Sequence, residues 1–231
     1  MNANEEVDEI ARRYARRAAT DRYSWLRPEV CRAVQERERK MLALFSRHGL
    51  HNLDAQRCIE VGCGNGANLL ELLRIGLSPE RLAGIELLPA RHADARARLP
   101  ASTAVHLGDA SVFEPEPQDL VLAFTVFSSI LDDAFQHRLA DAMWGWLRPG
   151  GAVLWYDFTV DNPRNPDVRG VPLPRVRALF PHASIDARRV TLAPPLARAA
   201  CRMHPALYTV LNSLPFLRTH LLAWIGKRNC A

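Results

Sequence analysis

The sequence has no paired cysteines, no long apolar run and almost no lysine. Its five cysteines are scattered and form no CxxC pair, and no His/Cys group has zinc spacing, so reduced thiols are the simplest interpretation. No run approaches the roughly 18 to 20 apolar residues that a membrane span needs. The N-terminal stretch MNANEEVDEIARRYARR carries acids before any apolar segment, which is not the pattern of a signal peptide. These absences predict a cytoplasmic protein without a transmembrane segment.

Nucleic-acid binding is also disfavoured, although the formal net charge is +5. The excess comes from scattered arginines rather than from a Lys/Arg block, and no aromatic-studded basic stretch accompanies it. A length of 231 residues with 48% hydrophobic content fits one globular domain, and neither an internal repeat nor a low-complexity tract divides it. We therefore expect a single domain over 1–231.

From residue 57 onward, apolar strand patterns alternate with helical ones. Short continuous apolar runs predict buried parallel strands over 57–62, 81–87, 103–109, 119–127 and 151–158, with helices over 67–75, 89–99 and 133–147 between them. A helix near 174–180, strands over 184–193 and 219–228, and a helical insert over 194–216 follow. The alternation predicts a doubly wound α/β sheet.

Two helices are predicted before the first strand. In the first, over 5–19, Val7, Ile10 and Tyr14 share one face. The second runs from about 29 to 48 and stops at Gly49. Because both precede the sheet, residues 1–50 are expected to form a helical lid. The break between the helices contains Tyr23 and Trp25, which are candidates to stack over a ligand or simply to pack within the lid.

The segment IEVGCGNGA (59–67) ends one predicted strand and opens a helix. Glycines there let the backbone turn sharply and approach a ligand closely. A tight turn without a ligand, or a dinucleotide site, would satisfy this segment alone. Three acids add information, because each lies near the carboxyl end of a predicted strand: Glu60, Glu86 and Asp109. Glu60 suits a cationic amino acid better than a pyrophosphate. Glu86 suits ribose hydroxyls, a position that would fit NAD equally well, and Asp109 suits an adenine amino group.

Five blocks in this order and spacing, EVGCGNG, GIELLP, LGDA, DLVLAFTVFSS and LRPGG, resemble the class I SAM-dependent methyltransferase family, where SAM is S-adenosylmethionine. The resemblance covers about residues 55–158. It implies a Rossmann-like sheet of seven strands that is mostly parallel and ends in an antiparallel hairpin. It also implies a SAM site made by Glu60, Gly62, Cys63, Gly64, Asn65, Gly66, Glu86, Leu87, Asp109, Ala110, Phe124 and Thr125.

A narrower resemblance concerns WYDF…DNPRNPDVRGV, TLAPPLAR and LPFLRTHLLAWI. These segments are similar to a bacterial subgroup of methyltransferases associated with glycans or secondary metabolites. The resemblance implies O-methylation of a hydroxyl on a small-molecule or glycan-type acceptor. The apolar insert would then cap the substrate, either as core packing or as a peripheral contact with a membrane that holds a lipid-linked acceptor.

The acceptor side is expected after the fifth predicted strand. Asp157 is the candidate base or acceptor-orienting carboxylate, and its alternative role is to organise the loop by binding backbone amides. Further candidates for acceptor contacts are Tyr156, Asn162, Asn165 and Arg169. The two asparagines precede prolines and are equally well explained as turn residues, and Arg169 is equally explained by pairing with Asp167.

No metal is predicted. Asp132 and Asp133, after the fourth strand, are more simply explained as an N-cap and first-turn charge of the following helix. Two alternatives to a methyltransferase stay open: an NAD(P)-dependent oxidoreductase on a similar fold, and a SAM-binding protein without catalysis. The first is disfavoured by Glu60 and by the lack of a Tyr-x-x-x-Lys pair, since only Lys227 follows Lys40.

Overall fold

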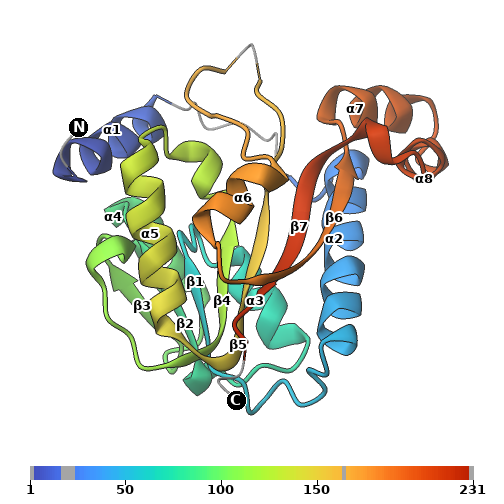
Figure 1. Cartoon of the computed structure of the whole chain (residues 1–231). Coiled ribbons are helices and arrows are strands. Elements are labelled where there is room, and N and C mark those ends of the chain that lie inside the picture. The colour runs from blue at the N-terminus through green and yellow to red at the C-terminus, as the bar shows by residue number, and fades with distance from the viewer. Residues whose placement is uncertain (1–2, 17–23, 163–164, 229–231) are drawn as a thin grey trace.

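A seven-stranded sheet in the order β3-β2-β1-β4-β5-β7-β6 lies at the centre of the computed structural model, which describes residues 3–16, 24–162 and 165–228 (Figure 1). The strands are β1 (Cys58–Val61), β2 (Leu82–Glu86), β3 (Ala104–Leu107), β4 (Gln118–Phe124), β5 (Leu147–Phe158), β6 (Ser184–Leu192) and β7 (Arg218–Gly226).

The first five strands are parallel, and β7 is antiparallel to both β5 and β6. The central strands are short apolar runs because helices cover both of their faces. In β4, for example, residues 120–124 are all buried. The predicted Rossmann-like fold with a terminal antiparallel hairpin is therefore confirmed, and the strand ends differ from the predicted ones by only a few residues.

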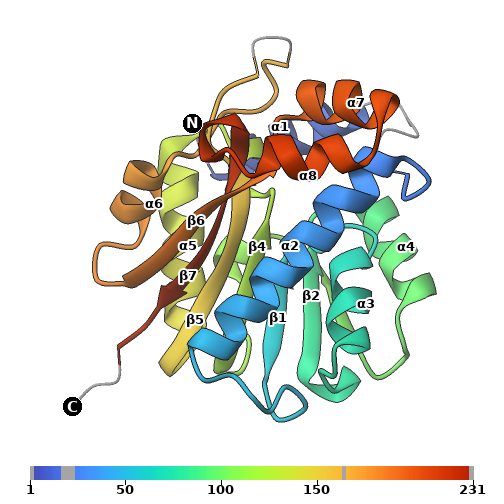
Figure 2. The same ribbon diagram turned by 90° about the vertical axis from the view of Figure 1, so that its right-hand side faces the viewer.

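Helices cover the two faces of the sheet in separate layers (Figures 1 and 2). On one face, α5 (Asp133–Trp146) and α6 (Leu173–Leu179) share a buried cluster with β1, β4 and β5. On the other face, α2 (Pro28–Arg47), α3 (Ala67–Arg74) and α4 (Pro89–Arg98) share a second cluster with the same strands. Short 3-10 helices complete the chain: η2 (Pro79–Arg81), η3 (Ala110–Val112), η4 (Phe127–Ser129) and η5 (Pro215–Leu217).

The two helices at the N-terminus, predicted together as a lid, occupy different places. The first, α1 (Ala3–Ala15), sends Ile10 into the cluster of the α5 face, near the carboxyl ends of the parallel strands. The long α2 instead buries Met41, Leu44 and Phe45 on the other face, beside β6 and β7. Only α1 is thus placed as a lid, since the wide apolar stripe of α2 is used to cover the sheet.

The predicted insert consists of two short helices, α7 (Pro194–Met203) and α8 (Ala206–Asn212). It is attached through a buried carboxylate on α2: Glu36 accepts hydrogen bonds from the Tyr208 hydroxyl (3.0 Å) and the Thr191 amide (3.3 Å). Within the described ranges, no helix is long and apolar enough to cross a membrane.

Candidate active site

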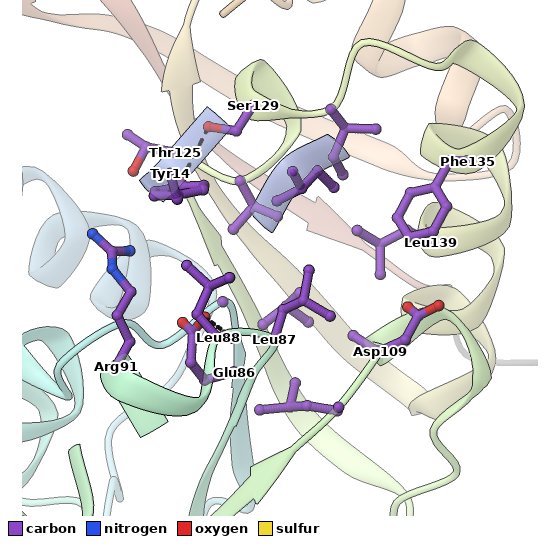
Figure 3. A pocket seen from close by; sticks show the side chains of 18 of the residues that line it. Tyr14, Glu86, Leu87, Leu88, Arg91, Asp109, Thr125, Ser129, Phe135 and Leu139 are labelled. Atoms are coloured by element: carbon purple, nitrogen blue, oxygen red, sulfur yellow. Dashed lines mark hydrogen bonds between the residues drawn. The ribbon is translucent and has the colours of Figure 1, made fainter. Parts of the chain in front are cut away.

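A cavity lies where β1, β2 and β4 end, beneath α1, and its volume is about 710 Å³ when the part that opens to solvent is included (Figure 3). Its polar lining includes carboxylates, one guanidinium and several hydroxyl groups, and the rest is apolar. The lining residues are Ile10, Tyr14, Val61, Gly62, Ile85, Glu86, Leu87, Leu88, Arg91, Gly108, Asp109, Ala110, Phe124, Thr125, Val126, Ser129, Ile130, Phe135 and Leu139.

The floor of this cavity is the glycine-rich turn between β1 and α3. Gly62 has φ +63°, and a Cβ there would lie 3.0 Å from a methyl group of Val126. Gly66, the N-cap of α3, has φ +79°, and its Cβ would meet Leu99 at 3.0 Å. Both positions combine a left-handed backbone with a close neighbour, so only glycine fits without strain.

Glu60, on β1 just before this turn, is a buried acid with spare hydrogen-bonding capacity. Its side chain is fully buried; Oε1 accepts a 2.6 Å hydrogen bond from the amide of Asn68, while Oε2 has no partner. Burial raises the pKa of Glu60 to about 8. A buried carboxyl oxygen without a donor is costly unless something arrives to pair with it.

Glu86 and Asp109 stand at the ends of β2 and β3 and both line the cavity. Glu86 accepts from the Gly64 amide (2.8 Å) and the Leu88 amide (2.9 Å), so it joins the glycine turn to the start of α4. Asp109 caps η3 by accepting from the amide of Ser111 (2.8 Å) and from its hydroxyl (2.9 Å). An ionised carboxylate has about four acceptor sites, so each acid keeps capacity for a ligand.

The roof of the cavity is α1, which is fastened by a buried ion pair. Glu6 accepts from Arg13 (2.6 Å) and from the Leu131 amide (3.0 Å), while Arg13 also donates to the Ser129 carbonyl (3.1 Å). The Tyr14 hydroxyl lies 3.2 Å from the Ser129 hydroxyl. Both side chains are labelled in Figure 3, where dashed lines mark the hydrogen bonds. These contacts hold α1 against the segment that follows β4.

We expect Glu6→Ala to release α1 rather than to unfold the domain. The substitution leaves the Arg13 guanidinium and the Leu131 amide without the acceptor that Glu6 provides. Breaking a buried ion pair of this kind costs about 3–5 kcal/mol. Amide hydrogen exchange should therefore accelerate in residues 3–15, with exchange in β1 and β4 unchanged. Glu9→Ala, which removes an exposed ion pair of α1 with Arg12, is the matched control. Equal protection of α1 in the Glu6→Ala and Glu9→Ala variants would contradict the assignment.

Seven of the predicted cofactor residues line the cavity: Gly62, Glu86, Leu87, Asp109, Ala110, Phe124 and Thr125. The other five, Glu60, Cys63, Gly64, Asn65 and Gly66, build the strand end and the turn below it. Cys63 is buried, and Asn65 accepts from the Ala67 amide within the turn (3.3 Å). The prediction missed Arg91, whose guanidinium lies 4.7 Å from the Tyr14 ring, and Ser129. The shared apolar face of Ile10 and Tyr14 was the sequence signal for the roof.

The candidates on β5 do not line the cavity. The Asp157 side chain is 1% exposed and accepts from the amides of Ser128 (3.0 Å) and Phe158 (2.8 Å). Burial raises its pKa to about 6, against the effect of these hydrogen bonds. Tyr156 points to the opposite face, where its hydroxyl lies 2.9 Å from that of Thr191. This geometry matches the loop-organising alternative for Asp157 rather than a base.

The remaining acceptor candidates that the structure describes do not line the cavity. Trp25 is 59% exposed, and Asn162 is exposed in the loop after β5. Asn165 organises a turn by accepting from the Asp167 amide (3.2 Å). Arg169 pairs with Asp133, and Asp167 pairs with Arg16 (3.0 Å) instead. Tyr23 lies outside the described residues.

The acids after β4 have the structural roles that the sequence favoured. Asp132 is the N-cap of α5, accepting from the Phe135 amide at 2.6 Å, and Asp133 lies in its first turn. Within the described part of the chain, no group of three or more His, Cys, Asp or Glu side chains has metal-binding geometry.

Residues 58–151 match the family model described as a methyltransferase domain. The match confirms the predicted methyltransferase domain over these residues, and the fold is the Rossmann-like one that was predicted for it. No curated protein sequence is significantly similar to it.

Solved structures resemble the chain at low sequence identity. N-methyltransferase NodS from Bradyrhizobium japonicum, in complex with S-adenosyl-L-homocysteine, has a TM-score of 0.62 at 16% identity, covering 96% of this chain and 98% of NodS. Phosphoethanolamine N-methyltransferase 2 of Haemonchus contortus, in complex with SAM, has a TM-score of 0.61 at 17% identity. The match covers 83% of this chain and 53% of that protein's chain. The StiE O-methyltransferase segment has a TM-score of 0.58 at 19% identity, and the match covers 84% of this chain and 75% of that segment. At such identities the likeness establishes the fold.

Proposed function

We propose that the chain transfers a methyl group from SAM to a hydroxyl of a small-molecule or glycan-type acceptor bound beneath α1. The observation that carries the proposal is the convergence of Glu86, Asp109 and the glycine turn around one cavity, with the buried Glu60 at the strand end just before that turn. SAM supplies a methyl group on a sulfonium, which leaves by in-line displacement when an acceptor is aligned with it. The chain provides the alignment and the exclusion of water.

The residues present fit this cofactor. The unpartnered oxygen of Glu60 is suited to the cationic amino group of a methionine moiety, and Gly62 leaves a space that a Cβ would fill. Glu86 has free acceptor capacity for ribose hydroxyls, and Asp109 and Ala110 are suited to the edge of an adenine. Similar structures that contain SAM or S-adenosyl-L-homocysteine support the same choice.

The lining of the cavity beneath α1 favours a hydroxyl acceptor. Tyr14 and Ser129 present hydroxyl groups there, Thr125 adds a third, and Arg91 contributes a positive charge. Among the described lining residues the only carboxylates are Glu86 and Asp109, which we assign to the cofactor. A cationic amine would therefore lack a carboxylate partner, whereas a neutral or anionic hydroxyl compound would find hydrogen-bonding partners.

Calorimetric titration with SAM, S-adenosyl-L-homocysteine and NADH tests the cofactor assignment. We expect binding of the first two and none of NADH. Preferential binding of NADH would favour the oxidoreductase alternative. Methyl transfer from labelled SAM to a panel of sugars, phenols and amines then tests the acceptor. SAM binding with transfer only to amines would overturn the hydroxyl assignment, and SAM binding without any transfer would favour the non-catalytic alternative.

We expect Asp157→Asn to lower stability and to slow turnover without removing a titrating base. The substitution replaces one of the two acceptor oxygens by an NH2 donor, so either the Ser128 or the Phe158 amide loses its acceptor, which costs about 1–3 kcal/mol. The η4 turn carries Ser129, so the same change displaces the methyl-acceptor end of the cavity. Thermal unfolding and the pH dependence of kcat measure the two effects. Disappearance of a rate limb near pH 6, the approximate pKa of Asp157, with stability unchanged, would restore Asp157 as the base.

A further inference from the structure

Large apolar side chains gather on the surface formed by the turn at 24–27, α7, α8 and η5. Of the twelve large hydrophobic residues exposed in the described parts of the chain, seven lie on these elements, and Leu26, Met203 and Phe216 are 94%, 80% and 71% exposed. The other four are Trp25, Leu196, Val210 and Leu214. Single exposed apolar residues are common, but a concentration of them marks an interaction surface.

The same surface is positively charged. No Asp or Glu occurs after residue 186 in the sequence, while α7 carries the exposed residues Arg198 and Arg202. A hollow between α7 and the start of α2 is lined by both, together with Pro195 and the pair of Arg27 and Glu29. Its charged side chains are therefore three arginines and one glutamate.

The inner faces of α7 and α8 pack against the rest of the chain, so only their outer faces are accessible to a partner. Ala197, Cys201 and Tyr208 are buried in a cluster with Leu192. Both helices lie at the end of the molecule that also carries α1, beyond the carboxyl ends of the parallel strands (Figures 1 and 2). A partner bound there would face the same end as the candidate active site.

We propose that α7, α8 and the 24–27 turn dock onto the surface of an anionic phospholipid bilayer. Helices of 10 and 7 residues cannot span a bilayer, but an apolar face flanked by arginines binds at the level of the headgroups. The hollow with Arg198 and Arg202 would receive lipid phosphates. This inference does not depend on the proposed methyl transfer.

Charge and chemistry favour this partner over two others. A second copy of the chain, meeting through the same patch, would bring the three arginines of each hollow together with only one glutamate from each copy, and that glutamate already pairs with Arg27. A nucleic acid would need a series of aromatic platforms for its bases, whereas five of the seven exposed apolar side chains of this surface are aliphatic or Met and only Trp25 and Phe216 are aromatic.

Co-sedimentation of the full chain with vesicles tests the proposal. We expect binding to vesicles that mix phosphatidylcholine with phosphatidylglycerol, and much weaker binding to phosphatidylcholine alone. Arg198→Glu with Arg202→Glu should weaken binding about tenfold or more, because each arginine near an anionic surface contributes substantially. The matched control with the same charge change is Arg98→Glu with Arg177→Glu, both exposed on other helices.

The apolar contribution is tested by Met203→Ser combined with Phe216→Ser. We expect weaker vesicle binding, whereas Leu107→Ser with Val112→Ser, which changes exposed apolar residues elsewhere, should leave it unchanged. Circular dichroism confirms folding of each variant. Equal binding to both vesicle types, no binding to either, or loss of binding in the control variants would overturn the proposal, as would concentration-dependent dimerisation that requires Met203 and Phe216.

Discussion

Glu60→Gln is expected to weaken SAM binding about 10- to 150-fold and, at the same time, to stabilise the ligand-free protein. The binding loss follows because a charge-assisted hydrogen bond to the methionine amino group contributes about 1.5–3 kcal/mol. The stability gain follows because burial raises the pKa of Glu60 from 4.5 to about 8. Above about pH 4.5 the unfolded chain releases this proton while the folded chain retains it, so wild-type stability falls as pH rises toward 8.

Glutamine occupies the same volume, still accepts from Asn68 and cannot ionise. The variant should therefore match the wild type at about pH 4.5 and exceed it in melting temperature at about pH 8, in thermal unfolding without ligand. Glu114→Gln, an exposed change of the same type after η3, is the control. SAM binding by the wild type should also release protons below about pH 8, which calorimetry in two buffers measures. An unchanged dissociation constant would remove Glu60 from the cofactor site.

Glu86→Ala is expected to raise the dissociation constant for SAM about 5- to 150-fold, which corresponds to about 1–3 kcal/mol. The carboxylate is 4% exposed and is the acceptor for both the Gly64 and Leu88 amides, so its loss also loosens the turn. Glu86→Gln, which keeps one acceptor oxygen, should have an intermediate effect. Calorimetric titration measures both variants.

A ribose role for Glu86 is separated from a purely structural one by a 2′-deoxy analogue of S-adenosyl-L-homocysteine. If Glu86 binds the hydroxyl, the analogue should lose affinity toward the wild type but bind the alanine variant about as well as the parent compound does. The same loss of affinity in both proteins would show that Glu86 acts only by shaping the turn.

The sheet was predictable because its strands are buried on both sides and are therefore apolar throughout. Strands such as β4 leave a continuous signal, and the glycines at 62 and 66 mark a turn that other residues cannot make. The three acids were predictable for a related reason: the carboxyl ends of parallel strands meet at one edge of the sheet, so spacing along the chain becomes proximity in space.

The roof of the cavity and the role of Asp157 were not predictable in the same way. Glu6 and Arg13 act on residues 129–131, more than a hundred positions away, and an acid and a base on a polar helix look like ordinary surface charges. At the end of β5, Tyr156 and Asp157 are neighbours in sequence but face opposite sides of the sheet. The role of Asp157 depends on η4, because the Ser128 amide in that turn donates a hydrogen bond to the Asp157 carboxylate. The sequence around β5 does not indicate this contact.

The roof has an expected kinetic consequence. Ile10 and Tyr14 lie over a cavity that is only partly open to solvent, and the Glu6–Arg13 pair fastens α1 there, so we expect a bound nucleoside to leave chiefly when this helix lifts. Release of spent S-adenosyl-L-homocysteine would then be the slow event in each cycle. The enzyme would show a burst of product in its first turnover and marked inhibition by S-adenosyl-L-homocysteine. The residence time of this by-product would be set by the Glu6–Arg13 ion pair rather than by the methyl-transfer step.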